Sequence, residues 1–236
     1  MVNNLASALF GLIHIALWRA VAPAGGGGYS GGQLVGMMVL AQTFAWLSIF
    51  LPAGLGIQLL VRTGSIATEM TRPVAFFPLT LAREAGNVAY QALYRAAPVA
   101  LVLTLAAGFP RPAGPAALAL ALPSLLLAAF NGLAATYCVG ISSLWTFEVR
   151  WAHWTYLSLV LLLCGGWVPA DMLPGWLGHV APYLPFAALM YYPMRIYLGF
   201  TGAVGLLVQA VWALLLAAAG RWLTARALQR LVVQGG

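Results

Sequence analysis

The sequence predicts an all-α, polytopic integral membrane protein with about six transmembrane helices and a re-entrant hairpin before the last of them. Of its 236 residues, 63% are hydrophobic and only 6% are charged, whereas soluble domains carry about 25% charged residues. The apolar residues form continuous runs and do not alternate with polar ones, which favours helices over a barrel. The arginines lie between these runs. We therefore expect a single transmembrane domain covering residues 1–236.

Each expected span is an apolar run of the length that crosses a hydrocarbon core, roughly 20 residues for about 30 Å. The expected spans are Asn3–Val21, Gln33–Leu60, Asn87–Gly108, Pro115–Trp145, Trp154–Val168 and Thr201–Arg221. The third should continue a helix that begins near Phe77. The fourth is long for one perpendicular helix, so we expect it to be tilted and bent near Pro123.

The first run is expected to remain in the mature chain as a span. It lacks the basic residues that begin a signal peptide, and Pro23 stands where cleavage after Ala20–Ala22 would have to occur.

The region 169–199 differs from the other runs because it is rich in proline yet remains apolar and aromatic. Proline at this density breaks regular helix, and irregular backbone at membrane depth must be covered by protein or face a cavity. We expect short helices that dip into the outer leaflet. The prolines are Pro169, Pro174, Pro182, Pro185 and Pro193.

The arginines predict that both termini lie in the cytoplasm. With this orientation the outer side holds only Arg19, Arg111 and Arg195, in agreement with the positive-inside rule. The inner side would hold Arg62, Arg72, Arg83, Arg95, Arg150, Arg221, Arg226 and Arg230.

Several functions are excluded or disfavoured by composition. The chain has no lysine, so it cannot form a P-loop for ATP or a Schiff base. Its net charge of +7 lies between apolar runs rather than on a soluble basic face, so we expect no nucleic-acid partner. Cys138 and Cys164 both lie in apolar runs and are expected to be buried, unpaired thiols.

Metal binding and intramembrane proteolysis have little support. The three histidines, His14, His153 and His179, fall in different segments without the spacing of metal ligands. Ser142 and Ser143 resemble a rhomboid-type serine motif only faintly, and the last span offers no histidine base. Their expected role is helix packing.

Polar residues within the spans suggest a translocation path or, alternatively, hydrogen bonds between helices. The candidates are Gln42, Asn87 and Asn131. A small secondary transporter or channel would usually need an acidic residue in mid-span. All four acids lie near span ends instead.

The segment 62–77 concentrates charge just after the second span. Residues Ile66–Met70 can form a short helix, with Ser65 as the N-cap. Arg72-Pro73 should end it, because proline disfavours helical geometry in the preceding residue. Taken alone, the segment is better explained as an interfacial loop whose arginines are held by anionic lipid.

The order of four motifs resembles the membrane subunit of a bacterial ABC-2 type exporter. They are LWRA (17–20), GYS (28–30), RTGSIATEMTRPV (62–74) and WVPADMLPGWLGHVAPYLPFAALMYYPMRIYLG (167–199). In such permeases the loop after the second span holds a coupling helix that docks into the ATPase subunit. The residues that match it are Gly64, Ile66, Glu69, Met70, Arg72 and Pro73.

The resemblance implies a non-enzymatic permease of the cytoplasmic (inner) membrane that exports a hydrophobic or amphipathic substrate. Its partners would be two copies of an ATPase, which bind ATP and Mg²⁺, a second permease and membrane lipid; the chain itself would bind no cofactor. The family usually begins with a basic amphipathic stretch before the first span. This sequence begins almost directly at the span, so we expect either a start further upstream or a chain without that helix.

Overall fold

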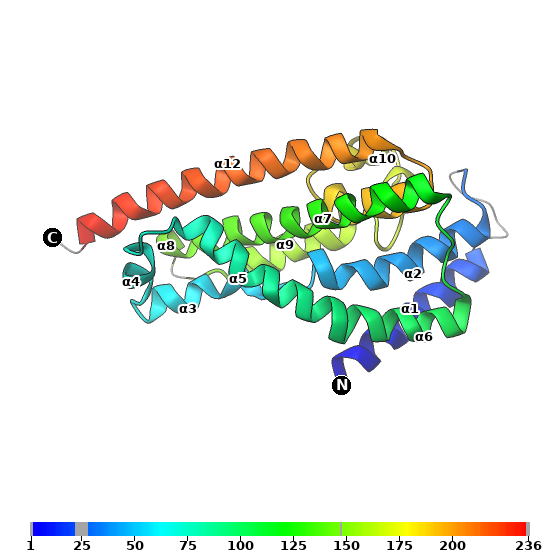
Figure 1. Ribbon diagram of the computed structural model, residues 1–236, viewed down its shortest axis with the longest axis horizontal. Coiled ribbons are helices and arrows are strands. Elements are labelled where there is room, and N and C mark those ends of the chain that lie inside the picture. The colour runs from blue at the N-terminus through cyan, green and yellow to red at the C-terminus, as the bar shows by residue number, and fades with distance from the viewer. Residues whose placement is uncertain (1, 22–27, 147, 235–236) are drawn as a thin grey trace.

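The structure is a computed structural model that describes residues 2–21, 28–146 and 148–234; the segment that holds Pro23 lies outside these ranges. All of the described elements are helices, which confirms the predicted all-α class. The longer helices lie along the long axis of the molecule (Figure 1). They are α1 (Val2–Val21), α2 (Gly31–Ser48), α5 (Phe76–Gln91), α6 (Ala97–Ala107), α7 (Pro115–Ile141), α9 (Arg150–Leu163) and α12 (Ala203–Gln234).

Short helices fill the connections between these long ones. They are η2 (Ala53–Gly56), α3 (Ile57–Arg62), α4 (Ile66–Met70), η3 (Ala92–Ala96), α8 (Ser143–Thr146), η4 (Ala170–Met172), α10 (Trp176–Val180), η5 (Ala181–Tyr183), η6 (Ala187–Leu189) and α11 (Tyr191–Tyr197).

Within the described ranges, five helical stretches are long and apolar enough to cross a membrane. They are Asn4–Val21, Gly31–Arg62, Phe76–Ala107, Pro115–Thr146 and Ala203–Gln229. The chain is therefore a polytopic membrane protein by length and composition. The expected fifth span corresponds to α9, which has 14 residues and is short for a perpendicular crossing. The count of six spans stays a prediction.

The second expected span is not one continuous helix, contrary to the prediction. Helix α2 ends at Ser48, and the chain then turns through η2 before α3 begins. Gly54, Leu55 and Gly56 have φ of 54°, 51° and 71°, the left-handed region that glycine adopts without strain. At this break Gly140 of α7 comes so close that a methyl group on it would overlap the Gly54 carbonyl oxygen.

The third and fourth expected spans agree better with the structure. A helix begins at Phe76 and continues through α5, the π-helical turn η3 and α6 to Ala107. Helix α7 begins with Pro115 at its first position and runs without interruption through Pro123 to Ile141.

Helix α7 is the centre of the packing, in contact with α2, α5, α9, α11 and α12. Polar side chains join it to α12 inside this interface. The Ser124 hydroxyl donates to the Gln209 amide oxygen at 2.7 Å, and the Tyr137 and Thr224 hydroxyls are 2.6 Å apart. Such bonds between helices hold membrane bundles together where water cannot compete.

The proline-rich region forms the short helices η4 to α11, as its sequence predicts. An ion pair ties its two ends together: Arg195 donates to the Asp171 carboxylate at 2.6 Å. The Tyr29 hydroxyl, just before α2, donates to the same carboxylate at 2.5 Å, and Arg195 also donates to the Thr201 hydroxyl at 3.0 Å. These bonds fix the region against the start of α2 and the approach to α12.

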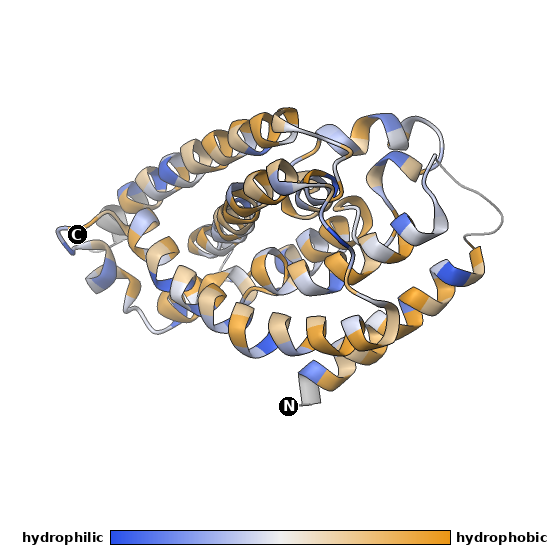
Figure 2. Cartoon of the chain, turned by 45° about the vertical axis from the view of Figure 1, so that its right-hand side comes forward, coloured by the Kyte–Doolittle hydropathy of each residue, from blue (hydrophilic) through white to orange (hydrophobic). Residues whose placement is uncertain are grey.

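Different short helices lie at the two ends of the molecule. Figure 1 places α3, α4, α8 and the C-terminal part of α12 at one end, and α10 with the start of α2 at the other. Hydrophobic residues predominate along the long helices (Figure 2), and many of their large apolar side chains are exposed; Leu105 of α6 is 81% exposed and Leu214 of α12 is 72% exposed. Such faces suit contact with lipid.

Candidate functional site

The predicted short helix is present as α4, at the same end of the molecule as the C-terminus (Figure 1). Gly64 has a φ of 74° and turns the chain between α3 and α4. Ser65 occupies the N-cap position, but its side chain makes no capping hydrogen bond, contrary to the prediction. Its backbone is already helical, with φ −68° and ψ −11°, whereas a capping side chain needs an extended backbone. The Ser65 hydroxyl instead lies 2.7 Å from the Thr63 hydroxyl.

One face of α4 is anchored in the protein. Ile66 is only 2% exposed and belongs to the core cluster that contains Phe76, Phe77 and Tyr137. Met70 packs against the same cluster. Residues four apart lie on the same side of a helix, so these two side chains fix the orientation of α4.

Glu69 is the electrostatic centre of the segment. Its carboxylate forms ion pairs at 2.9 Å with Arg72, two residues after the end of α4, and at 2.9 Å with Arg83 of α5. The Glu69 side chain is 16% exposed, while Arg72 and Arg83 are 49% and 46% exposed. The acid is therefore used within the chain, and the guanidinium groups retain a solvent-facing side.

The other face of α4 and the turn after it are exposed. The exposed residues are Ala67, Thr68, Thr71, Arg72, Pro73 and Val74. This surface combines small, apolar and basic side chains on a helix whose opposite side is held by the core.

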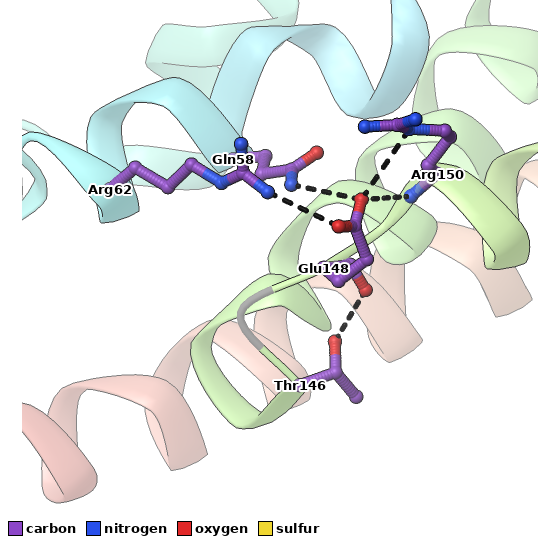
Figure 3. A network of polar contacts seen from close by, with 5 residues as sticks. All are labelled: Gln58, Arg62, Thr146, Glu148 and Arg150. Atoms are coloured by element: carbon purple, nitrogen blue, oxygen red, sulfur yellow. Dashed lines mark hydrogen bonds and ion pairs between the residues drawn. The ribbon is translucent and has the colours of Figure 1, made fainter.

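A second ion-pair cluster surrounds Glu148 (Figure 3). Arg62 donates to its carboxylate at 3.2 Å, and the Arg150 guanidinium lies 3.8 Å away. The Gln58 amide nitrogen is 3.3 Å from the same group. This hydrogen bond, together with Arg150 and Arg62, lowers the pKa of the Glu148 carboxyl. The cluster ties the end of α3 to the start of α9.

Sequence reasoning missed both partners, Arg83 for Glu69 and Glu148 for Arg62. These pairs could have been suspected because the chain has only four acidic residues and the predicted topology fixes the side of the membrane on which each one lies. Glu69 and Glu148 fall on the side to which all these arginines were assigned, and charges without local counterions tend to pair there.

The three candidate path residues lie in different surroundings. Gln42 lines an apolar cavity of about 200 Å³ between α1, α2 and α9. Asn87 lines another cavity, of about 240 Å³ and more polar, and Phe50 lines both. Asn131 is fully buried and donates to the Gln209 carbonyl oxygen at 3.1 Å, which is the expected alternative, a bond between helices. No hydrogen bond among the described residues links any two of the three.

The remaining candidates are the histidines, Ser142 and the two cysteines. No group of three potential metal ligands occurs in the part of the chain that the structure describes. The His14 ring is 3.0 Å from the Phe10 carbonyl oxygen. The Ser142 hydroxyl donates to the Val139 carbonyl at 2.6 Å. Cys138 and Cys164 are free thiols.

Comparison with known families matches nearly the whole chain to one family. The family model described as "ABC-2 family transporter protein" matches residues 25–235, which include the α4 segment, both ion-pair clusters and the proline-rich region. Neither a curated protein nor a solved structure matches the chain. The match spans nearly the entire sequence, and the chain therefore belongs to the ABC-2 family of transporter proteins.

Proposed function

We propose that this ABC-2 family chain is the permease subunit of an ATP-driven exporter in the cytoplasmic membrane. Its substrate is hydrophobic or amphipathic: a drug, an antibiotic peptide or a lipid. The subunit has no ATP site of its own; two copies of a separate ATPase hold ATP and Mg²⁺. A second permease, identical or paralogous, completes the translocation path, and both termini lie in the cytoplasm.

The observation that carries this proposal is the construction of α4. Its buried face is fixed by Ile66 and Met70, while Thr68 and Arg72 face outward. A helix of five residues has little stability of its own, so its hold on the core is what keeps it formed. An anchored helix with an exposed face, followed by an exposed arginine, is suited to docking a partner protein.

The same anchoring gives a route for coupling. Glu69 links α4 to Arg83 of α5, and Ile66 packs in one cluster with Phe76, Phe77 and Tyr137 of α7. A displacement of α4 by a closing ATPase would therefore move α5 and α7 with it. ATP binding would then shift the permease between two conformations through its differential contact with α4.

Cysteine crosslinking tests the docking role directly. In a background lacking Cys138 and Cys164, Thr68→Cys should crosslink, in native membranes, to a subunit that azido-ATP photolabels. Ala225→Cys is the matched control, because Ala225 is exposed near the same end, on α12. A labelled product of equal yield at both positions, or no labelled product at Thr68, would remove α4 from the docking role.

A further inference from the structure

Arg95 lies within a long apolar helical stretch, beside the start of α1. It lies in the π-helical turn η3, within the apolar stretch Phe76–Ala107. At a rise of 1.5 Å per residue, Arg95 is about 18 Å from the C-terminal end of this stretch at Ala107. The Asn4 side chain, at the start of α1, donates to the Tyr94 carbonyl at 2.8 Å. Arg95 is therefore level with the beginning of the first span, which is the inner edge of the membrane in the expected topology.

The Arg95 guanidinium has no anionic partner in the described part of the chain. It lies over the Trp46 ring, 4.8 Å from the centroid. None of the ion pairs or hydrogen bonds of the described residues involves it. A basic side chain without a counterion at the inner edge of the membrane attracts anionic head groups.

A cavity of about 240 Å³ lies beside this guanidinium, between the end of α2 and the α5–η3 helix. Gln91 is only 5% exposed and no hydrogen bond of the described residues uses its amide. The Trp46 indole N–H also lacks an acceptor. Asn87 donates to Glu84 at 3.2 Å, and no acid lines the cavity. The lining includes Trp46, Phe50, Asn87, Tyr90, Gln91 and Arg95.

We propose that this cavity binds the phosphate or carboxylate head group of an anionic amphiphile in the inner leaflet. Arg95 supplies the positive charge, Gln91 supplies an amide donor, and the aromatic rings of Trp46 and Tyr90 suit the membrane interface. The π-helical turn is itself a frequent feature of functional sites.

The neighbouring cavity explains why the ligand is an amphiphile rather than a free anion. Phe50 also lines the cavity of about 200 Å³ between α1, α2 and α9, whose other walls include Phe10, Ile49 and Trp167. In the proposed arrangement the alkyl chain lies along Phe50, the side chain that both cavities share, and extends toward the apolar cavity. The inference does not depend on the ATPase, because a resident lipid and a transported one present the same head group to Arg95.

Native mass spectrometry of the detergent-purified chain tests the proposal with two lipids of equal chain length. Lysophosphatidylglycerol is anionic and lysophosphatidylcholine is zwitterionic. The wild type should retain the anionic lipid at a concentration at least tenfold lower, as expected for a desolvated charge contact. Arg95→Gln should abolish this difference, and Arg95→Lys should restore most of it.

Arg226→Gln is the matched control, because the Arg226 guanidinium also lies over a tryptophan, Trp222, at 5.5 Å but lines neither cavity. It should keep the preference. Gln91→Leu should lower the preference severalfold without removing any charge, which tests the site even if Arg95→Gln fails to fold. Equal retention of both lipids by the wild type, an equal loss in Arg226→Gln, or displacement of the lipid by equimolar inorganic phosphate would overturn the proposal.

Discussion

At the scale of single residues, Glu69 has the most consequential contacts. Its carboxylate binds Arg72 on one side and Arg83 on the other, so it joins the α4 segment to α5. The resemblance places Glu69 and Arg72 in a coupling helix, and that role stays a prediction. The structure adds that Glu69 has two partners within the chain, while both arginines remain about half exposed.

Glu69→Ala should therefore lower the stability of the permease only slightly. Both arginine partners are about half exposed, and exposed ion pairs contribute 0 to about 1 kcal/mol each because water screens them. The measurement is the midpoint of thermal unfolding in detergent. Glu84→Ala serves as the control. The Glu84 carboxylate accepts a hydrogen bond from the Asn87 amide and belongs to none of the ion pairs of the described residues. A loss of about 3 kcal/mol or more would show that the pairs are not screened as their exposure implies.

At the scale of elements, the break between α2 and α3 is a close contact between two backbones. Gly140 of α7 touches the Gly54 carbonyl, and Gly132, two turns earlier, touches the Ser48 carbonyl at the end of α2. Small residues let helices approach in this way inside membranes. The break thus brings α3, and with it α4, against the central helix.

Gly140→Ala should destabilise the protein by about 1–3 kcal/mol, since the added methyl group would force the two backbones apart. Gly86→Ala is a control of the same chemistry, because Gly86 is in the middle of α5 and a methyl group there meets no atom within 4 Å. That substitution should be neutral or stabilising by about 0.5–1 kcal/mol. Thermal unfolding of the two variants separates the cases, and equal midpoints would contradict the close contact.

At the scale of the whole molecule, the sequence predicts those features that depend on residues close together in the chain. The short helix Ile66–Met70 and the proline-broken region 169–199 are both visible in the sequence. The break after Ser48 was missed because a continuous apolar run outweighed Pro52 and the two glycines that cause it.

The sequence placed Arg62 and Glu148 on the same side of the membrane but did not show which distant residues pair. Arg62 and Glu148 are paired only because α3 ends beside the start of α9. The bond from Asn131 to Gln209 likewise depends on how α7 packs against α12. Helical periodicity relates residues three or four apart and carries no information on such pairs.

The most direct test of the proposed docking role of α4 is the amount of ATPase that co-purifies with each copy of the permease. Arg72→Ala and Arg83→Ala each remove one partner of Glu69, so they have similar consequences inside the chain. Only Arg72 belongs to the α4 docking segment, and losing a desolvated charge contact there costs roughly 2–5 kcal/mol, enough to weaken binding more than tenfold. We predict that Arg72→Ala loses most of the ATPase and of the transport, while Arg83→Ala keeps both near the wild-type level. The same ATPase ratio in the wild type and both variants, with transport unchanged, would contradict the coupling role of this segment.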